Sequence, residues 1–237
     1  MKKLWTSCML ALAMCGSGFA DESFTDKASP QFDATSFCKT ISGDFNSCVS
    51  GNANKYFDPE AVHVCSRITN DGMKNECFSI IRDRYFDRGV LPVCDRYRTA
   101  HGTNRCLRIV ADGRYDQNAL LVCNRYSGEE ETNQCLRHIT NNQFERRALM
   151  VCDRYAKAAV TTDCIDIIAN RNFDPGALQV CDRFRTAYDT NACLSHIADR
   201  SFDPEILKVC DSYSTLSGTL RCLDQFASNA MLQQEQF

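Results

Sequence analysis

The spacing of the cysteines constrains the fold of this 237-residue chain more than any other feature. From Cys65 onward the cysteine numbers rise alternately by 12 and by 17, so every second cysteine lies about 29 residues further along the chain. A fixed period of this length is typical of repeat proteins, in which each unit packs mainly on its neighbours. Besides Cys38 and Cys48 near the start, the set comprises Cys65, Cys77, Cys94, Cys106, Cys123, Cys135, Cys152, Cys164, Cys181, Cys193, Cys210 and Cys222.

The unit from Phe173 to Ser201 shows what one period encodes. Asp174 followed by Pro175 is the pattern of an N-cap and a first helical residue. Phe173 and Leu178 stand where a hydrophobic staple crosses that cap. Apolar residues then recur at helical spacing, which predicts a first helix over residues 175–185.

A second helix is predicted in the same unit after a polar loop. Thr190 is a candidate N-cap, and the apolar stripe runs from Cys193 to Ala198 before the helix ends near Arg200. Each 29-residue period is therefore predicted to be an αα-hairpin.

The same features recur along the chain. The staple aromatics are Phe57, Phe86, Tyr115, Phe144, Phe173 and Phe202. The caps are Asp58, Asp87, Asp116, Glu145, Asp174 and Asp203. A core position of the first helix holds Val62, Leu91, Leu120, Leu149, Leu178 and Leu207, and one of the second holds Ile81, Val110, Ile139, Ile168, Ile197 and Phe226. Pro92 lies early inside a first helix and is expected to strain its first turn.

We therefore predict an all-α fold, an αα-hairpin solenoid of about six 29-residue repeats over residues 32–237. A degenerate opening unit begins at Phe32-Asp33 and contains Cys38 and Cys48, whose spacing is shorter than that of the later pairs. Such atypical terminal units are expected in solenoids.

The first twenty residues resemble a signal peptide. Lys2 and Lys3 precede an apolar stretch that is too short to span a bilayer, and Gly18-Phe19-Ala20 fits a cleavage site after Ala20. Lipid anchoring at Cys15 is the alternative, although Met14 is bulky where a small residue is normal. Residues 21–31 are expected to form a polar, mobile leader. The mature chain is predicted to be exported, periplasmic or secreted, with no transmembrane segment.

In an oxidising compartment, an even and regular set of cysteines indicates a disulfide framework. Two pairings suit antiparallel helices: within one hairpin, as in Cys181–Cys193, or between hairpins, as in Cys193–Cys210. Pairing within hairpins uses all fourteen cysteines, whereas pairing between hairpins leaves Cys38 and Cys222 without partners. We therefore expect one disulfide per hairpin.

With a cysteine in each helix of every αα-unit, residues 32–226 resemble the cysteine-rich Sel-type members of the tetratricopeptide-like repeat class. The resemblance is architectural, because the repeat length and the cysteine spacing differ from that class. It implies a secreted α-solenoid that binds a protein or a ligand, and it transfers no functional residue.

Arginines follow the first cysteine of most units, and Arg67, Arg96, Arg125, Arg154 and Arg183 should form one ridge at the spacing of stacked helices. One interpretation is a structural ladder, in which each arginine bonds the neighbouring unit. The other is a basic surface that binds acidic or carboxylate ligands. Ser212 ends the ridge, and Ile68 replaces the tyrosine that follows the arginine in other units.

The loops within hairpins differ in character and are candidates for recognition. They are predicted at residues 98–102, 127–131, 156–160 and 185–189, where His101, Glu130 and Tyr188 are candidate binding residues. His138 and His196 share one position of the second helix two repeats apart, which excludes a shared metal and favours half-buried structural histidines.

The sequence contains no motif typical of catalysis, metal binding or a cofactor. Most of its carboxylates recur in every unit as caps, whereas a catalytic pair should be unique. Without residues 1–20, 25 basic and 30 acidic residues give a net charge near −5, which argues against nucleic-acid binding. We expect a non-enzymatic scaffold that binds a protein or cell-envelope partner, including an inhibitor or immunity-type factor. A structural spacer or assembly factor, or an envelope-glycan hydrolase, is the alternative.

Overall fold

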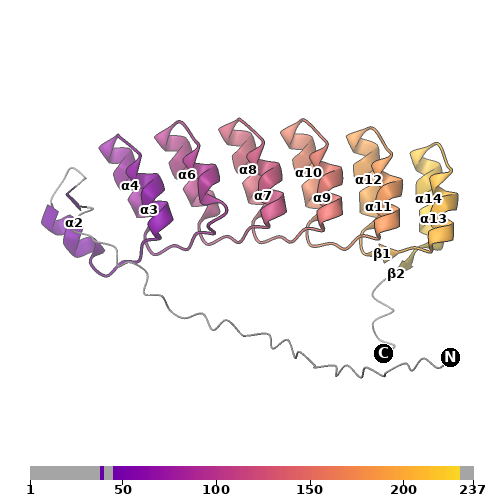
Figure 1. The fold of residues 1–237 in the computed structure, drawn as a ribbon, viewed down its shortest axis with the longest axis horizontal. Helices are drawn as coiled ribbons and strands as arrows, with labels where there is room; N and C mark the ends of the chain where they lie inside the picture. Colours follow the sequence, from indigo (N-terminus) through magenta and orange to yellow (C-terminus); the bar gives the residue numbers. More distant parts are fainter. Residues whose placement is uncertain (1–37, 40–44, 230–237) are drawn as a thin grey trace, which may run out of the picture. The chain divides into compact units, whose positions relative to one another are not determined.

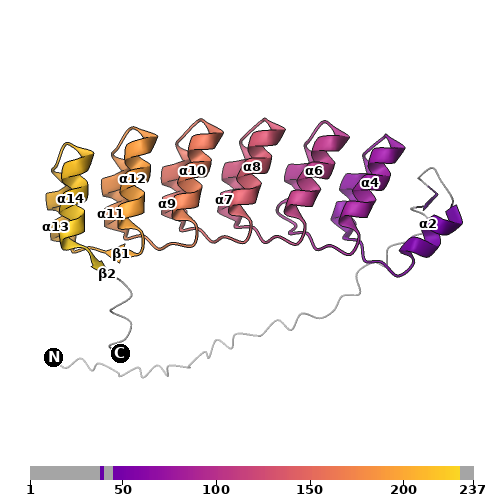
Figure 2. The same ribbon diagram turned by 180° about the vertical axis from the view of Figure 1, so that it is seen from behind.

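The structure is a computed structural model that describes residues 38, 39 and 45–229. The predicted signal peptide with Cys15, the predicted leader and Phe32-Asp33 lie outside these residues, as do residues 230–237. Six αα-hairpins follow one another in a row after one further helix, α2 (Phe45–Asn52) (Figures 1 and 2). The predicted all-α repeat fold is confirmed. No helix in the described part of the chain is long and apolar enough to cross a membrane.

Each hairpin consists of a first helix, called helix A, and a second helix, called helix B. The A helices are α3 (Pro59–Ser66), α5 (Leu91–Asp95), α7 (Gln117–Asn124), α9 (Arg146–Asp153), α11 (Pro175–Asp182) and α13 (Pro204–Asp211). The B helices are α4 (Asp71–Ile81), α6 (Ala100–Val110), α8 (Glu129–Ile139), α10 (Ala158–Ile168), α12 (Ala187–Ile197) and α14 (Leu216–Phe226). The starts of the B helices are evenly spaced and follow the period of the cysteines.

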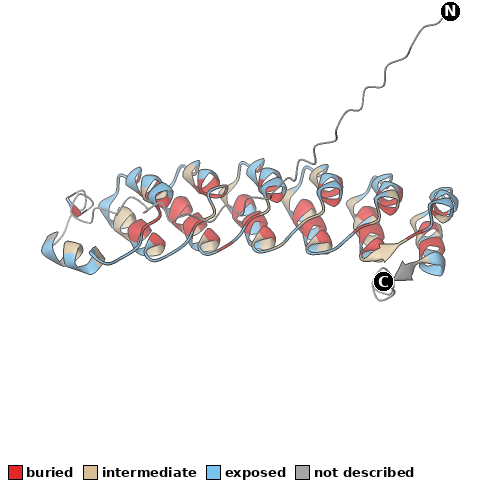
Figure 3. Cartoon of the chain, turned by 60° about the horizontal axis from the view of Figure 1, so that its bottom comes forward, coloured by how far each residue is buried: buried red, intermediate tan, exposed pale blue. Residues whose placement is uncertain are grey.

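The hydrophobic core runs through the whole row. Each B helix packs on the next B helix, from α4 and α6 through to α12 and α14, and the A helices α7, α9, α11 and α13 pack likewise. Buried residues recur in every hairpin along the row (Figure 3). Because a single hairpin buries few residues, its stability depends on both neighbours.

Among the described residues, six disulfides join the two helices of the six hairpins, as predicted, and Cys38 pairs with Cys48 of α2. Within the described residues the pairs are Cys38–Cys48, Cys65–Cys77, Cys94–Cys106, Cys123–Cys135, Cys152–Cys164, Cys181–Cys193 and Cys210–Cys222. Their Cα atoms lie 5.4–5.8 Å apart, the usual separation for a disulfide.

The predicted caps of helix A are confirmed in most units. The Asp174 carboxylate accepts hydrogen bonds from the backbone N–H groups of Gly176 and Ala177, and Pro175 occupies the first turn. Glu145 caps α9 in the same way through the N–H of Ala148.

Three predictions about the helix ends were wrong. Helix α11 ends at Asp182 and not at Arg185, because Phe184 N–H turns back to the Cys181 carbonyl. The cap of α12 is Thr186, whose extended backbone lets its hydroxyl accept from Asp189 N–H, whereas Thr190 lies inside the helix and is buried. Helix α12 ends at Ile197 because Asp199 adopts a left-handed backbone conformation.

Two residues behave differently from their equivalents. Pro92 does not strain a full first helix; α5 begins only at Leu91, so that Pro92 lies in its first turn, where no N–H is needed. Phe226, predicted in the core, is 44% exposed, because no further hairpin follows α14 among the described residues.

Successive hairpins are joined at the inter-repeat turns by a backbone bridge that the sequence analysis missed. Two residues after each B helix from α4 to α12 stands an Asp or Asn with φ between 56° and 60°. Its N–H donates to a carbonyl in the preceding turn, and its side-chain oxygen accepts from the N–H of that same residue. Asp112 brackets Tyr85 in this way, at 2.8 and 3.0 Å. These Asx bridges are formed by Asp83, Asp112, Asn141, Asn170 and Asp199.

A pair of two-residue strands occupies the equivalent place at the last turn. Strand β1 (Arg200–Ser201) pairs antiparallel with β2 (Ser228–Asn229), and Ser201 lies opposite Ser228. This pairing continues the Asx bridges at the end of the described chain, and it does not change the all-α class of the fold.

We predict that the bridge at Asp112 makes stability depend on pH. The Arg84 guanidinium, followed by the Tyr85 backbone N–H, holds the pKa of the Asp112 carboxyl below its ordinary value. The carboxylate charge therefore contributes fully above the unfolded-state pKa of about 3.9, and its contribution is lost as pH falls through the lower folded-state pKa. In urea unfolding, the stability difference between wild type and Asp112→Asn should be largest near pH 6 and shrink below pH 3.

The control for this prediction is Asn141→Ala, which removes a bridge that cannot titrate. Its stability loss should stay constant over the same pH range. A difference between wild type and Asp112→Asn that does not change with pH contradicts the role given to the carboxylate.

Candidate functional site

Four of the five arginines of the predicted ridge make one shared set of contacts with the next hairpin, whereas Arg67 contacts only the Asp95 carboxylate there. Each of Arg96, Arg125, Arg154 and Arg183 directly follows its helix A. Each donates to the backbone carbonyl 28 residues later, to the carbonyl 30 residues later and to a threonine hydroxyl 36 residues later. We call this set of contacts the arginine ladder.

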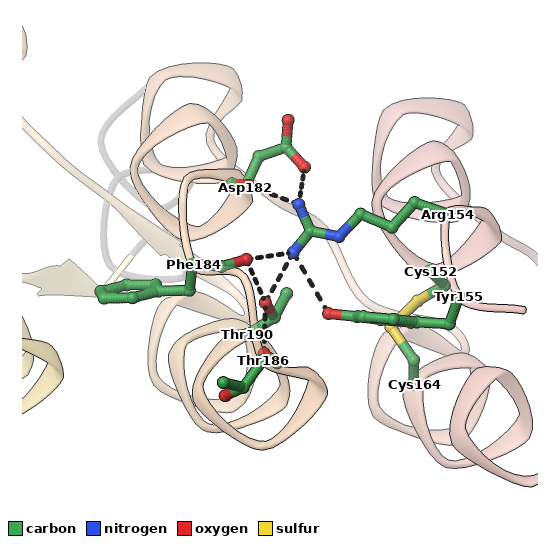
Figure 4. Close-up of polar contacts among 8 residues, drawn as sticks. All are labelled: Cys152, Arg154, Tyr155, Cys164, Asp182, Phe184, Thr186 and Thr190. Atoms are coloured by element: carbon green, nitrogen blue, oxygen red, sulfur yellow. Dashed lines mark hydrogen bonds and ion pairs between the residues drawn. A yellow bond between two sulfur atoms is a disulfide. The ribbon is translucent and has the colours of Figure 1, made fainter. Parts of the chain in front are cut away.

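Arg154 shows the arrangement in full (Figure 4). Its Nη1 contacts the carbonyl and the carboxylate of Asp182, with 2.6 Å to Oδ1. Its Nη2 donates to the Phe184 carbonyl at 2.8 Å, to Thr190 Oγ1 at 2.6 Å and to the Tyr155 hydroxyl at 3.1 Å. The guanidinium also lies 5.2 Å from the centroid of the Tyr155 ring.

These contacts place a positive charge at the C-terminal end of each following helix A. The last carbonyls of a helix lack partners within the helix and carry partial negative charge, so a guanidinium satisfies and stabilises them. Both Nη atoms of Arg154 are engaged, so the guanidinium has no free pair of N–H donors with which to bind a carboxylate ligand. The geometry therefore favours the structural ladder, and a ligand role for these arginines stays a prediction.

The threonines that complete the ladder, Thr132, Thr161, Thr190 and Thr219, were not recognised from the sequence. They are buried at the same position of successive B helices, and Thr103 occupies this position in α6, where Arg67 contacts the Asp95 carboxylate instead. The hydroxyl of Thr190 accepts from Arg154 and donates to the carbonyl of Phe184 or Thr186. Their periodic spacing was the available signal, but a contact 36 residues away is visible only in three dimensions.

The other candidate binding residues lie on helices and not in loops, which corrects the prediction. His101, Glu130 and Tyr188 are each the second residue of a B helix, because the helices begin earlier than expected. All three are exposed, and Tyr188 is 80% exposed. Glu130 forms an ion pair with Arg105 of the preceding hairpin. The three residues belong to three different hairpins, so the structure does not gather them into one site.

His138 and His196 are half-buried, as expected, and each faces a carboxylate of the next hairpin. His138 Nδ1 lies 2.5 Å from Asp166 Oδ1, and His196 Nε2 lies 3.5 Å from Asp224 Oδ2. No cluster of three metal-ligating side chains occurs in the ranges that the structure describes.

The A helices expose an apolar surface that the sequence analysis did not single out. Leu121 on α7 and Met150 on α9 occupy equivalent positions of neighbouring repeats, and they are 70% and 67% exposed. A groove of about 430 Å³ lies beside Met150 between α9 and α11, where Arg147, Val151, Leu178 and Gln179 line it. We call Leu121, Met150 and this groove the helix A face.

Two larger pockets lie at opposite ends of the hairpins. One of about 770 Å³ lies at the inter-repeat turns and includes Tyr85, Asp87 and Asp116, but both carboxylates already accept backbone hydrogen bonds. The other, of about 540 Å³, lies at the loops within the hairpins between α3 and α6. It includes Tyr97, where burial raises the pKa of the phenol to about 12, so this hydroxyl stays protonated and donates to Asn133 Oδ1.

Comparisons with protein-family models, with curated proteins and with solved structures found no match to this chain. The resemblance to Sel-type repeats therefore stays a prediction.

We predict that Arg154→Gln lowers the free energy of unfolding by about 1.5–3 kcal/mol, because the charge-assisted hydrogen bonds are lost and their acceptors are left without donors. In urea unfolding, Thr190→Val should lower the stability of the Arg154→Gln variant less than it lowers that of wild type. The difference between the two losses, which is the coupling energy of the pair, should be at least about 0.5 kcal/mol. The control is Arg185→Gln, an exposed arginine of the following loop, which should change stability by less than about 0.5 kcal/mol. Equal effects of the two arginine substitutions contradict the ladder.

Proposed function

We propose that this protein is an exported, non-enzymatic repeat scaffold that binds a protein of the cell envelope or its surroundings through the helix A face. The observation that carries the proposal is the exposure of Leu121 and Met150 at equivalent positions of neighbouring helices. Large apolar side chains that are exposed beside a partly apolar groove favour a protein-interaction surface.

Chemistry around the patch supports a protein partner. Methionine adapts its shape to different partner side chains, which suits a binding surface. Arg146 and Arg147 on α9 are exposed and have no ion-pair partner within the described residues, although the chain as a whole is acidic. The partner surface should therefore offer an apolar side chain next to carboxylates.

Variation among the repeats supports the same surface. The position of Leu121 and Met150 holds His63, Pro92, Gln179 and Lys208 in the other hairpins, whereas the caps, cysteines and ladder residues hardly vary. Positions that differ while the scaffold is kept constant are those at which a repeat protein can specify a partner.

Export is supported by the seven disulfides, which persist in oxidising compartments. A role as a structural spacer is the second candidate, because the arginine ladder and the Asx bridges crosslink successive hairpins at both edges. An inhibitor or immunity-type factor is one form of the first proposal.

The test is affinity capture with the mature, oxidised protein from its native envelope, followed by identification of the partner and a direct binding measurement. Leu121→Gln and Met150→Gln together should weaken binding by more than tenfold, because each buried apolar side chain contributes about 1.5–3 kcal/mol. Glutamine is the natural residue at this position of α11, so the hairpins should remain folded.

The matched control for this test is Tyr188→Ser, which places on α12 the residue that α14 carries at the equivalent position. This variant should bind the partner as wild type does. Binding that survives the Leu121/Met150 change but fails with Tyr188→Ser assigns recognition to the B helices and contradicts the proposal.

A further inference from the structure

We propose that the hairpin α5–α6 binds an arginine side chain of a peptide or protein ligand in the pocket of about 540 Å³, where the arginine ladder is interrupted. The proposal rests on a comparison inside the molecule, since four other hairpins show which group fits the equivalent place. The pocket lies at the loops within the hairpins and does not include Leu121 or Met150, so it is independent of the proposed function.

Four hairpins hold a guanidinium group on the same set of acceptors, which we call the arginine seat. In the hairpin α13–α14, the seat consists of the carbonyls of Asp211 and Tyr213 and of Thr219 Oγ1. Arg183 of the preceding hairpin binds them at 2.8, 2.7 and 2.6 Å. The hairpins α7–α8, α9–α10 and α11–α12 bind Arg96, Arg125 and Arg154 on the equivalent acceptors.

The hairpin α5–α6 carries the same acceptors without the same partner. They are the carbonyls of Asp95 and Tyr97 and the hydroxyl of Thr103, and all three residues line the pocket. Arg67 is the equivalent arginine, but its Nη1 contacts only the Asp95 carboxylate. Its side chain is 58% exposed, compared with 29–33% for Arg125, Arg154 and Arg183.

The residue after the arginine differs in the same way, since an aromatic residue follows each arginine that fills a seat and Ile68 follows Arg67. Arg125, Arg154 and Arg183 lie over the ring of the following aromatic residue, with 4.9–5.5 Å between the guanidinium and the ring centroid. Such a contact holds the guanidinium in a fixed direction. Arg67 is followed by the buried Ile68, which has no π face, so its side chain is free to turn outward to Asp95.

The seat selects the chemical class of its ligand. Two carbonyls and one hydroxyl accept from a planar group with several N–H donors, which a guanidinium provides and an ammonium does not. Arg98 also lines the pocket, is exposed and has no ion-pair partner among the residues described, so a carboxylate next to the arginine in the ligand would pair with it. The ligand that fits is therefore a segment in which an arginine neighbours an acidic residue.

The experiment titrates the mature, oxidised protein with the peptide acetyl-Gly-Arg-Glu-Gly-amide and follows the backbone amides of Tyr97, Thr99 and Thr103 by NMR. We expect saturable shifts confined to this pocket, and weaker binding of the peptide with lysine in place of arginine. Thr103→Val should weaken binding about tenfold, the loss expected for one hydrogen bond to a charged group. Thr219→Val, in the seat that Arg183 fills and outside this pocket, should leave binding unchanged.

A second variant tests the seat without altering its acceptors. Ile68→Tyr introduces the residue found after Arg96, Arg125 and Arg154, and it should draw Arg67 into the seat and abolish peptide binding. The proposal is overturned if wild type does not bind while Arg67→Ala does, because Arg67 then fills the seat in solution. It is also overturned if the lysine peptide binds equally well or if Ile68→Tyr binds as wild type does.

Discussion

The disulfide between the two helices of each hairpin is the constraint on which the rest of the structure depends. A single pair of helices with 8 and 11 residues, such as α11 and α12, is too short to be stable alone in water. Crosslinking cysteines 12 residues apart restricts the unfolded chain, which is worth about 3 kcal/mol per hairpin in the loop-entropy model. Each unit is thereby held in a shape that its neighbours can pack against.

Stacking of these units is then secured at both edges. At the loops within hairpins, the arginine ladder neutralises the C-terminal carbonyls of the following helix A, as Arg154 does at Asp182. At the inter-repeat turns, the Asx bridges join consecutive turns through backbone and side chain, as Asp112 does at Tyr85. Most of the polar groups that recur in the sequence are engaged in these structural hydrogen bonds, so the residues that differ between repeats are the ones available for binding.

The sequence was sufficient to predict the features that are formed by contacts within one repeat. The period, the caps such as Asp174, the staple aromatics and the pairing of Cys181 with Cys193 all follow from contacts within one unit. Contacts between units could not be predicted: Thr190 looked like a cap because its partner, Arg154, lies 36 residues away, and Asn170 gave no sign of its left-handed backbone. The helix A face was missed because Leu121 and Met150 are apolar residue types that usually lie in a core. Their exposure becomes visible only when the hairpins are packed together in the row.

Peptide mapping of the oxidised protein under non-reducing conditions tests the central claim most directly. Proteolysis with thiols blocked at low pH should release fragments in which Cys181 is linked to Cys193 and Cys210 is linked to Cys222. Fragments in which Cys193 is linked to Cys210 would show that the crosslinks join different hairpins, and would contradict both the unit and the stacking described above.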